Sequence, residues 1–378
     1  MADSSLPSVL KHYPAVFAVG NSYRISVYTQ KEAFFSVKVG NTEYSDHSNG
    51  ILRSKDPVHS VTVPMKELNF YKEYTVCIRP VIKRLPYFTK TASPVSIKIP
   101  FKPVEKLEGI KIYHLSDTHG HDKYSAMAGG YFGDELDLLV LNGDIIDHSG
   151  DVKNFEIIYK LCSDITAGQH PCVFSRGNHD LRGSAAEELE KYTPTDGGKS
   201  YFTFRLGVLW GMVLDCGEDK PDDHEEYGHS ISCHEFRLEE ERFIDRVIEN
   251  AADEYAAPGV KYRIIISHNP FTYLHVPPFD IEQPLYRSWI WKLRREVKPQ
   301  LLISGHLHQT AVVFKGEKLD NFEYMCPVVI GSKYIRDAKN NVTDFIGCGI
   351  ALYSNYAAVD FTDSERKCVE RRSVNIIK

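Results

Sequence analysis

Short segments in which apolar and polar residues alternate dominate the first hundred residues of the chain. Alternation with a period of two places one face of a segment on a core and the other in solvent, as in β-strands. Turn-forming residues, such as Gly40-Asn41 and Ser48-Asn49-Gly50, separate the segments. A small antiparallel β-sandwich is therefore predicted. Its strands are expected at 15–19, 23–28, 34–39, 59–63, 74–81 and 95–99.

The pattern changes near residue 105, after a segment (101–107) that carries a proline and charges. Beyond it, apolar strands alternate with amphipathic helices, which predicts an α/β domain at 106–378 behind an all-β domain at 1–105. Residues Phe155, Ile158, Tyr159, Cys162 and Ile165, for example, recur at helical spacing. Strands are expected at 110–116, 137–142, 171–175, 201–205, 208–214, 262–267, 301–304 and 311–314. Helices are expected at 154–167, 238–255 and 284–297, and two or three antiparallel strands within 349–374.

Polar segments of one kind follow five of the apolar runs. They are Asp117-Thr118-His119, Asn142-Gly143-Asp144-Ile145-Ile146-Asp147, Gly177-Asn178-His179-Asp180, Ser267-His268-Asn269-Pro270 and Gly305-His306-Leu307-His308. Loops that leave the carboxyl ends of strands in an open α/β sheet can converge on one site. Taken alone, Asp117-x-His119 is equally compatible with a helix-capping aspartate beside a surface histidine.

The chemistry of these segments points to metal ions. Asp, Asn and His provide oxygen and nitrogen donors without sulfur, which suits Mn, Fe, Zn or Mg rather than a thiolate site. The donors outnumber the needs of one ion. A carboxylate that bridges then suggests two metals, which can stabilise both the attacking and the leaving oxygen of a phosphoryl displacement.

In this order, the five segments closely resemble the calcineurin-like metallophosphoesterase superfamily, from about residue 110 to the C-terminus. The resemblance implies a four-layer αββα sandwich with a dinuclear site on one rim. Its first metal would be held by Asp117, His119, Asp144 and His308. Its second would be held by Asp144 as the bridge, Asn178, His268 and His306.

The resemblance also implies how the site would act. His179 would bind the scissile phosphoryl group and protonate the leaving oxygen, and a metal-bridging hydroxide would attack. Asp147 would pair with His179, because the second aspartate of the matching motif does so in related protein phosphatases; the alternative is a solvated charge at a helix start. We expect a hydrolase of phosphomonoesters or small phosphodiesters that uses Mn, Fe or Zn. The alternative is a catalytically inactive binding or scaffold module with the same fold.

The front domain carries resemblances of its own. The spacing from Leu68 to Tyr74 is similar to the tyrosine corner of immunoglobulin-like and fibronectin-like domains. A β-sandwich ahead of a phosphoesterase domain resembles the layout of purple acid phosphatases. That family has a tyrosine where Asp147 stands and no histidine in the place of His119, so its ferric-tyrosinate centre is not expected here.

Two residues near the motifs allow more than one interpretation. Arg176 could contact substrate phosphate or form a surface salt bridge, and His114 is expected to be a hydrogen-bonded core histidine. Segment 215–236 is too polar for a core element and could form a wall of the substrate pocket. Its His224, His229 and His234 are expected to be exposed rather than metal-bound.

The net charge of the chain limits the classes of molecule that it is expected to bind. The 378 residues carry a net charge of 45 − 51 = −6. Acidic residues in the 215–236 segment would repel a nucleic-acid backbone; they are Asp219, Asp222, Asp223, Glu225 and Glu226. A small phosphorylated substrate is expected instead, and the oligomeric state stays open.

Eight scattered cysteines without a Cys-x-x-Cys pair predict reduced thiols. No signal-like start or membrane-length apolar run is present, so a cytoplasmic location is expected; a signal peptide removed beforehand would mean secretion.

Overall fold

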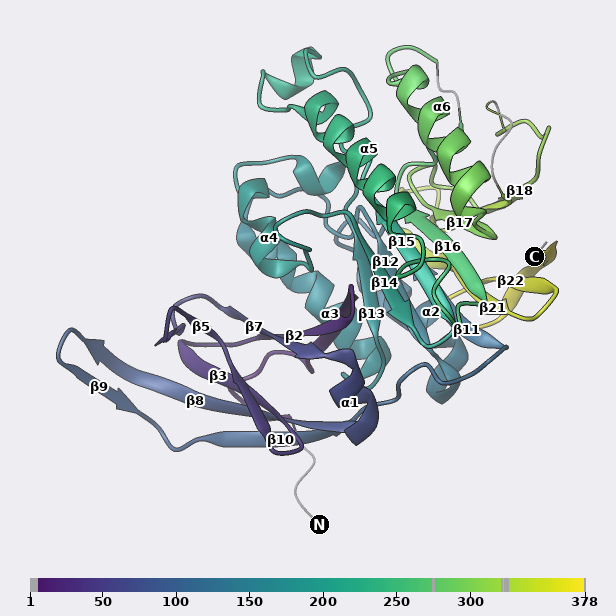
Figure 1. Cartoon of the computed structure of the whole chain (residues 1–378). Coiled ribbons are helices and arrows are strands. Elements are labelled where there is room, and N and C mark those ends of the chain that lie inside the picture. The colour runs from purple at the N-terminus through teal and green to yellow at the C-terminus, as the bar shows by residue number, and fades with distance from the viewer. Residues whose placement is uncertain (1–5, 274–275, 321, 323–325, 377–378) are drawn as a thin grey trace.

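The computed structural model describes residues 6–273, 276–320, 322 and 326–376. Two central sheets pack face to face and helices cover their outer faces, so the predicted αββα order is present (Figure 1). The first five residues, which belong to the segment searched for a signal, lie outside the described part.

The larger central sheet has ten strands in the order β23-β22-β21-β11-β12-β13-β1-β2-β7, with β20 paired to β21. Its parallel centre is β11, β12, β13 and β1, and the antiparallel strands β21 and β2 flank it. The strands are β1 (Ala15–Val19), β2 (Ser22–Tyr28), β7 (Val58–Pro64), β11 (Ile110–Leu115), β12 (Leu138–Asn142), β13 (Cys172–Ser175), β20 (Lys333–Arg336), β21 (Val342–Leu352), β22 (Tyr356–Thr362) and β23 (Cys368–Asn375).

The second central sheet has six strands in the order β14-β15-β16-β17-β19-β18. Its middle strands are parallel, and β14 and β18 are antiparallel edges. The strands are β14 (Phe202–Leu206), β15 (Leu209–Leu214), β16 (Tyr262–Ser267), β17 (Leu301–Ser304), β18 (Ala311–Val313) and β19 (Val328–Ile330).

Helices form the two outer layers. Buried apolar residues of α2 and α3 pack on the outer face of the larger sheet, and those of α5 and α6 pack on the outer face of the six-stranded sheet. The α-helices are α1 (Met65–Tyr71), α2 (Lys123–Gly129), α3 (Glu156–Thr166), α4 (Leu189–Tyr192), α5 (Cys233–Glu249) and α6 (Gln283–Lys292). Shorter turns are η1 (Gly130–Glu135), η2 (Val152–Phe155), η3 (His179–Leu181), η4 (Ala186–Glu188), η5 (Glu225–Tyr227) and the π-helical η6 (Leu293–Val297).

The period of two in the central strands explains this layering. In β11, Ile110 and Ile112 face the core between the sheets, whereas Tyr113 and Leu115 face the helical layer. Because both faces are covered, these strands are apolar almost throughout. The polar residues that follow them are left at the carboxyl edge, where the loops begin.

The front region shares a sheet with the rest of the molecule. Strand β1 pairs in parallel with β13, with Phe17 opposite Cys172, so β1, β2 and β7 extend the larger central sheet. A five-stranded sheet packs against this extension. Its strands are β3 (Ala33–Val39), β4 (Thr42–Ser45), β8 (Glu73–Leu85), β9 (Phe88–Thr91) and β10 (Val95–Pro100); β5 (His47–Ser48) and β6 (Ile51–Leu52) form a separate small hairpin.

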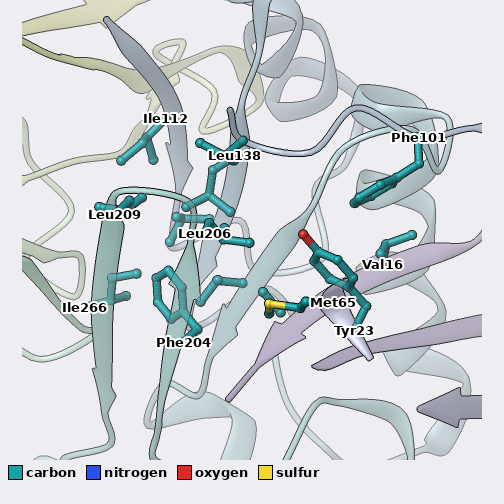
Figure 2. Close-up of a cluster of buried hydrophobic side chains, with 14 of the residues drawn as sticks. Val16, Tyr23, Met65, Phe101, Ile112, Leu138, Phe204, Leu206, Leu209 and Ile266 are labelled. Atoms are coloured by element: carbon teal, nitrogen blue, oxygen red, sulfur yellow. The ribbon is translucent and has the colours of Figure 1, made fainter. Parts of the chain in front are cut away.

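One core runs through both regions. Figure 2 shows Val16, Tyr23 and Met65 of the front region in the same cluster as Ile112 and Leu206 of the central sheets. The front region is β-rich, as the sequence predicted, although it also contains helix α1. The domain boundary near residue 105 stays a prediction, because hydrogen bonds and apolar contacts cross it.

The predicted tyrosine corner is wrong. The hydroxyl of Tyr74 donates to the carbonyl of Gly168, 2.8 Å away, rather than to backbone a few residues upstream. This buried bond ties the front region to the end of α3. Helix α1 was also not expected, and α5 begins at Cys233 rather than near residue 238.

Two further expectations concern the environment of the chain. All eight cysteines are free thiols, as predicted. Within the part of the chain that the structure describes, no helix has both the length and the apolar character needed to cross a bilayer.

Candidate metal centre

The five polar segments meet where parallel strands of the two central sheets end. Strands β11, β12 and β13 supply three of them, and β16 and β17 supply two from the facing sheet. All the predicted ligands therefore lie on loops anchored by buried strands. Rigid anchoring of this kind holds a metal site more closely than ligands on mobile loops would.

The backbone at these ligands is in an uncommon conformation. Five of them have left-handed φ angles, a region that costs a non-glycine residue about 1 kcal/mol or more. The angles are 55° at Asp117, 41° at His119, 52° at Asp144, 66° at His306 and 49° at His308. Hydrogen bonds between the loops hold this backbone in place. For example, the His119 N–H donates to the Asp144 carbonyl at 2.9 Å.

One group of donors contains Asp117, His119 and His308, whose ligand atoms lie within 4.8 Å of one another. The two Nε2 atoms of His119 and His308 are 3.3 Å apart. The Asp117 Oδ1 atom lies 3.5 Å from Nε2 of His308. Asp117 is buried, whereas the side chain of His308 reaches solvent.

A second group contains Asp144, His268 and His306. The Asp144 Oδ2 atom is 3.2 Å from Nε2 of His268, and Nδ1 of His306 is 3.0 Å from Oδ1 of Asn178. The same Asp144 oxygen lies 4.0 Å from Nε2 of His119 in the first group. Asp144 thus stands between the groups, where a bridging carboxylate would have to be.

Buried carboxylates in both groups favour the binding of cations, as the shifts in pKa indicate. Burial, together with Asp144, raises the pKa of Asp117. Burial would also raise the pKa of Asp144, but the neighbouring His268 ring lowers it below its usual value. Burial opposes charge on His268, yet Asp144 raises its pKa to about 10. Burial lowers the pKa of His119 to about 4, which keeps its ring neutral at physiological pH, as a metal ligand must be.

The donor set fits two metal ions. Ligand atoms at about 2.1 Å from one ion and at right angles are about 3 Å apart. The His119–His308 pair of the first group, at 3.3 Å, and the Asp144–His268 pair of the second, at 3.2 Å, agree with that spacing. The identity of the metals stays a prediction.

Residues around the ligands hold the loops together, and sequence reasoning assigned them no role. The buried Asp180 carboxylate accepts from the backbone N–H of Gly177 at 2.7 Å and of Asp144 at 3.2 Å. Burial and the Asp144 charge raise the pKa of Asp180 to about 7. A side chain at Gly177 would collide with Asp144, because an added Cβ would lie 2.3 Å from its Oδ1 atom. Asn142 crosses between the sheets, since its amide donates to the Ile303 carbonyl at 3.1 Å.

His179 lies beside the first group, but its pairing differs from the expectation. Its Nδ1 atom is 2.8 Å from the backbone carbonyl of Asp147 rather than paired with the carboxylate. The exposed Asp147 carboxylate instead lies 3.5 Å from Nδ1 of His119. The loop after β12 places the carbonyl and the carboxylate of Asp147 on different histidines. The expected Asp147–His179 ion pair is therefore replaced by two separate contacts.

Arg182 is next to His179 and was not predicted. Its Nη1 atom lies 3.4 Å from Nε2 of His179. The fully buried Glu218 carboxylate accepts from Arg182 Nε and Nη2 at 2.9 and 2.8 Å. Asp219 accepts from the same Nη2 atom at 3.3 Å, and its other oxygen lies 3.8 Å from Nε2 of His306. The sequence signal was available only as an arginine that follows the Gly-Asn-His-Asp segment.

Arg176 and His114, which the sequence left open, both make structural contacts. The Arg176 Nε atom donates to the buried Asp215 carboxylate at 2.6 Å, so it forms an ion pair. His114 is a buried core histidine, as predicted, and accepts from the Asn142 amide at 3.1 Å. Burial lowers its pKa to about 3.

The acidic segment borders the site through Asp219 rather than through its histidines. His229 and His234 are exposed, as expected, and His224 is half-buried. Among the described residues, none of these three belongs to a group that could hold a metal. That this segment forms a wall of a substrate pocket stays a prediction.

Comparisons with known proteins bear on the family and the fold of the chain. The family model of calcineurin-like phosphoesterases matches residues 110–310. A search of curated proteins found no match. Among solved structures, the purple acid phosphatase PPD1 from yellow lupin (Lupinus luteus) seeds is 13% identical, with a TM-score of 0.60 over 97% of this chain and 75% of that chain. PhoD is 11% identical, with a TM-score of 0.55 over 99% of this chain and 90% of that chain.

Structural similarity at such low sequence identity establishes the fold alone. Both alignments include the β-rich front region. The family model spans all of the strands that carry the candidate ligands. The chain belongs to the calcineurin-like phosphoesterase family.

Proposed function

We propose that this protein hydrolyses phosphomonoesters or small phosphodiesters with the help of two metal ions. The observation that carries the proposal is the position of Asp144 between two groups of donors, 3.2 Å from His268 and 4.0 Å from His119. The proposed metals are Mn, Fe or Zn, in line with the donor types. One ion would be held by Asp117, His119, Asp144 and His308. The other would be held by Asp144, Asn178, His268 and His306.

When bound, such a pair of cations supplies a nucleophile from water near neutral pH and offsets the charge of the phosphoryl group. The protein contributes the fixed geometry. Asp117 and Asp144 are buried, the Asp180 carboxylate accepts from the Asp144 N–H, and the Asp117 N–H donates to the Gly143 carbonyl in the neighbouring loop. Preorganised charge of this kind is a large source of catalysis because nothing must reorganise during the reaction.

We assign proton donation to the leaving oxygen to Nε2 of His179. A carbonyl can only accept, so the contact with the Asp147 carbonyl places a proton on Nδ1. The other nitrogen, Nε2, is then the one that gains and loses a proton. The His179 ring packs edge-on against His119 with 4.6 Å between centroids, which places it next to the first group.

We assign Asp147 a positioning role toward the metal ligand His119. A carboxylate near the second nitrogen of a metal-bound imidazole fixes its tautomer and raises its basicity. The distance of 3.5 Å from Asp147 Oδ1 to Nδ1 of His119 suits that role. The protonation of the leaving group would then depend on the carbonyl of Asp147 and not on its carboxylate.

We assign Arg182 to the phosphoryl oxygens. Glu218 holds its guanidinium from one side through two hydrogen bonds, and this leaves Nη1 directed toward His179. Burial opposes charge on Arg182, but Glu218 and Asp219 raise its pKa, so the arginine stays charged. Because Nε and Nη2 donate to Glu218 and Asp219, Nη1 is the group left to donate a charge-assisted hydrogen bond to a phosphoryl oxygen.

The proposed function predicts metal-dependent hydrolysis. Protein stripped of metal should lose hydrolysis of p-nitrophenyl phosphate or bis-p-nitrophenyl phosphate and regain it with Mn²⁺. Asp144→Asn should lower the rate about 100-fold or more, because the bridging charge is lost. Asp134→Asn, at a fully exposed carboxylate, is the matched control. Protein that binds Mn²⁺ and hydrolyses neither substrate would instead support the inactive scaffold.

Substitutions at His179 and Asp147 should have different signatures. His179→Ala should slow an alkyl phosphate about 100-fold or more and p-nitrophenyl phosphate far less, because nitrophenolate leaves without a proton. Asp147→Asn should keep the leaving-group dependence of the wild type and weaken retention of one metal ion about tenfold or more. Plots of rate against leaving-group pKa, with metal titrations of both variants, test this. Equal losses on all esters in His179→Ala, or the same pattern in Asp147→Asn, would contradict the assignments.

Arg182→Lys keeps the charge but removes the fork that Glu218 holds. We expect KM to rise, and inhibition by inorganic phosphate to weaken, about tenfold, because a charge-assisted bond is lost. Arg176→Lys is the matched control, since it alters a comparable ion pair that, among the described residues, makes no contact with His179. Thermal unfolding of both variants measures structural damage. Wild-type phosphate affinity in a thermally weakened Arg182→Lys would show that the arginine is only structural.

A further inference from the structure

A separate cavity opens beside the candidate metal centre. It offers an open space of about 400 Å³, including its mouth, between the loop that follows β16, the start of α6 and Phe322. His306 and Asp219 line it, and these two residues also belong to the surroundings of the second donor group. A substituent of a bound phosphate ester would reach this cavity within a few covalent bonds of the phosphorus atom.

The lining combines aromatic rings with carboxylates. Five aromatic side chains line it, together with two acidic ones, and none of the lining residues is a lysine or an arginine. The aromatic residues are Phe271, Tyr273, Phe279, Tyr286 and Phe322. Aromatic faces carry negative potential, so a ring-lined space that also contains carboxylates is complementary to a cation.

The two carboxylates of the cavity differ in their partners. Asp219 is compensated, because Arg182 lies at 3.3 Å and Lys220 at 3.4 Å. Asp280 is half-buried, and among the described residues its carboxylate makes no ion pair or side-chain hydrogen bond. A carboxylate that is partly removed from water without a partner is unfavourable. A positively charged ligand in the cavity would supply the missing partner.

Two cations already touch these rings from outside the lining. Lys220 Nζ lies 5.4 Å from the centroid of the Phe279 ring, and the Arg287 guanidinium carbon lies 4.3 Å from that of Phe322. The charge of Lys220 is offset by Glu226 at 2.8 Å as well as by Asp219. The Lys220 contact therefore does not reverse the negative character of the lining, and Arg287 is not one of the lining residues.

We propose that this cavity binds a positively charged ammonium substituent of the substrate, as found in phosphate esters of amino alcohols. The proposal deepens the proposed function, on which it rests, by naming a class of substrate. The cation would lie between the aromatic rings and Asp280, while the phosphoryl group occupies the metal centre. A neutral group of the same shape would gain the apolar contacts but not the electrostatic ones.

Direct binding tests the cavity without catalysis. Choline and its neutral isostere 3,3-dimethylbutan-1-ol are titrated into metal-free and Mn²⁺-loaded protein by NMR. We expect choline to bind about tenfold more tightly than the isostere, and Phe279→Ala and Asp280→Asn each to reduce that preference severalfold. Phe70→Ala and Asp134→Asn, at exposed positions, are the matched controls. Equal binding of the two probes, or a preference that survives both cavity variants, would overturn the proposal.

Hydrolysis separates this inference from the function on which it rests. For Mn²⁺-loaded protein, choline phosphate should show a kcat/KM about tenfold above that of 3,3-dimethylbutyl phosphate, and Asp280→Asn should remove the difference. Hydrolysis of p-nitrophenyl phosphate without any preference between the two esters would refute the inference and leave the function standing. Selective choline binding without hydrolysis of any ester would refute the function and leave the cavity standing.

Discussion

Two buried carboxylates, Asp117 and Asp144, impose the constraint on which the site depends. Both are almost completely removed from water, and both lie within 4.0 Å of the same His268 nitrogen. Like charges buried together are costly unless positive charge compensates them. His268 compensates part of this negative charge, and its pKa rises to about 10 as a result. Two metal ions would compensate the remainder, which is why we interpret the donors as a dinuclear centre.

The surrounding structure keeps these charges in place. Left-handed backbone at five ligands, the close approach of Gly177 and the two backbone bonds to Asp180 leave the loops little freedom. Further out, Glu218 fixes Arg182, while Asp147 and Asp219 lie near the outer nitrogens of His119 and His306. Acidic residues thus surround the centre in two layers. The inner layer is suited to metals, and the outer one orients the basic groups.

The sequence located the strands and the polar segments that follow them, because both depend on local patterns. Apolar runs of period two locate β11, β12 and β16, and each ligand follows such a run. Tertiary relationships were not predictable in this manner. Nothing local shows that Phe17 pairs with Cys172 in one sheet, or that Tyr74 reaches Gly168. The roles of Arg182 and of the Asp147 carbonyl likewise depend on how separate loops approach one another.

The most direct test of this account is the number and coupling of bound metal ions. Metal-free protein is titrated with Mn²⁺, the bound ions per chain are counted, and the electron paramagnetic resonance spectrum is recorded. A centre bridged by Asp144 predicts two ions per chain and the multiline spectrum of a spin-coupled pair, with the coupling lost in Asp144→Asn. One ion per chain, or two ions without coupling, would contradict the dinuclear centre.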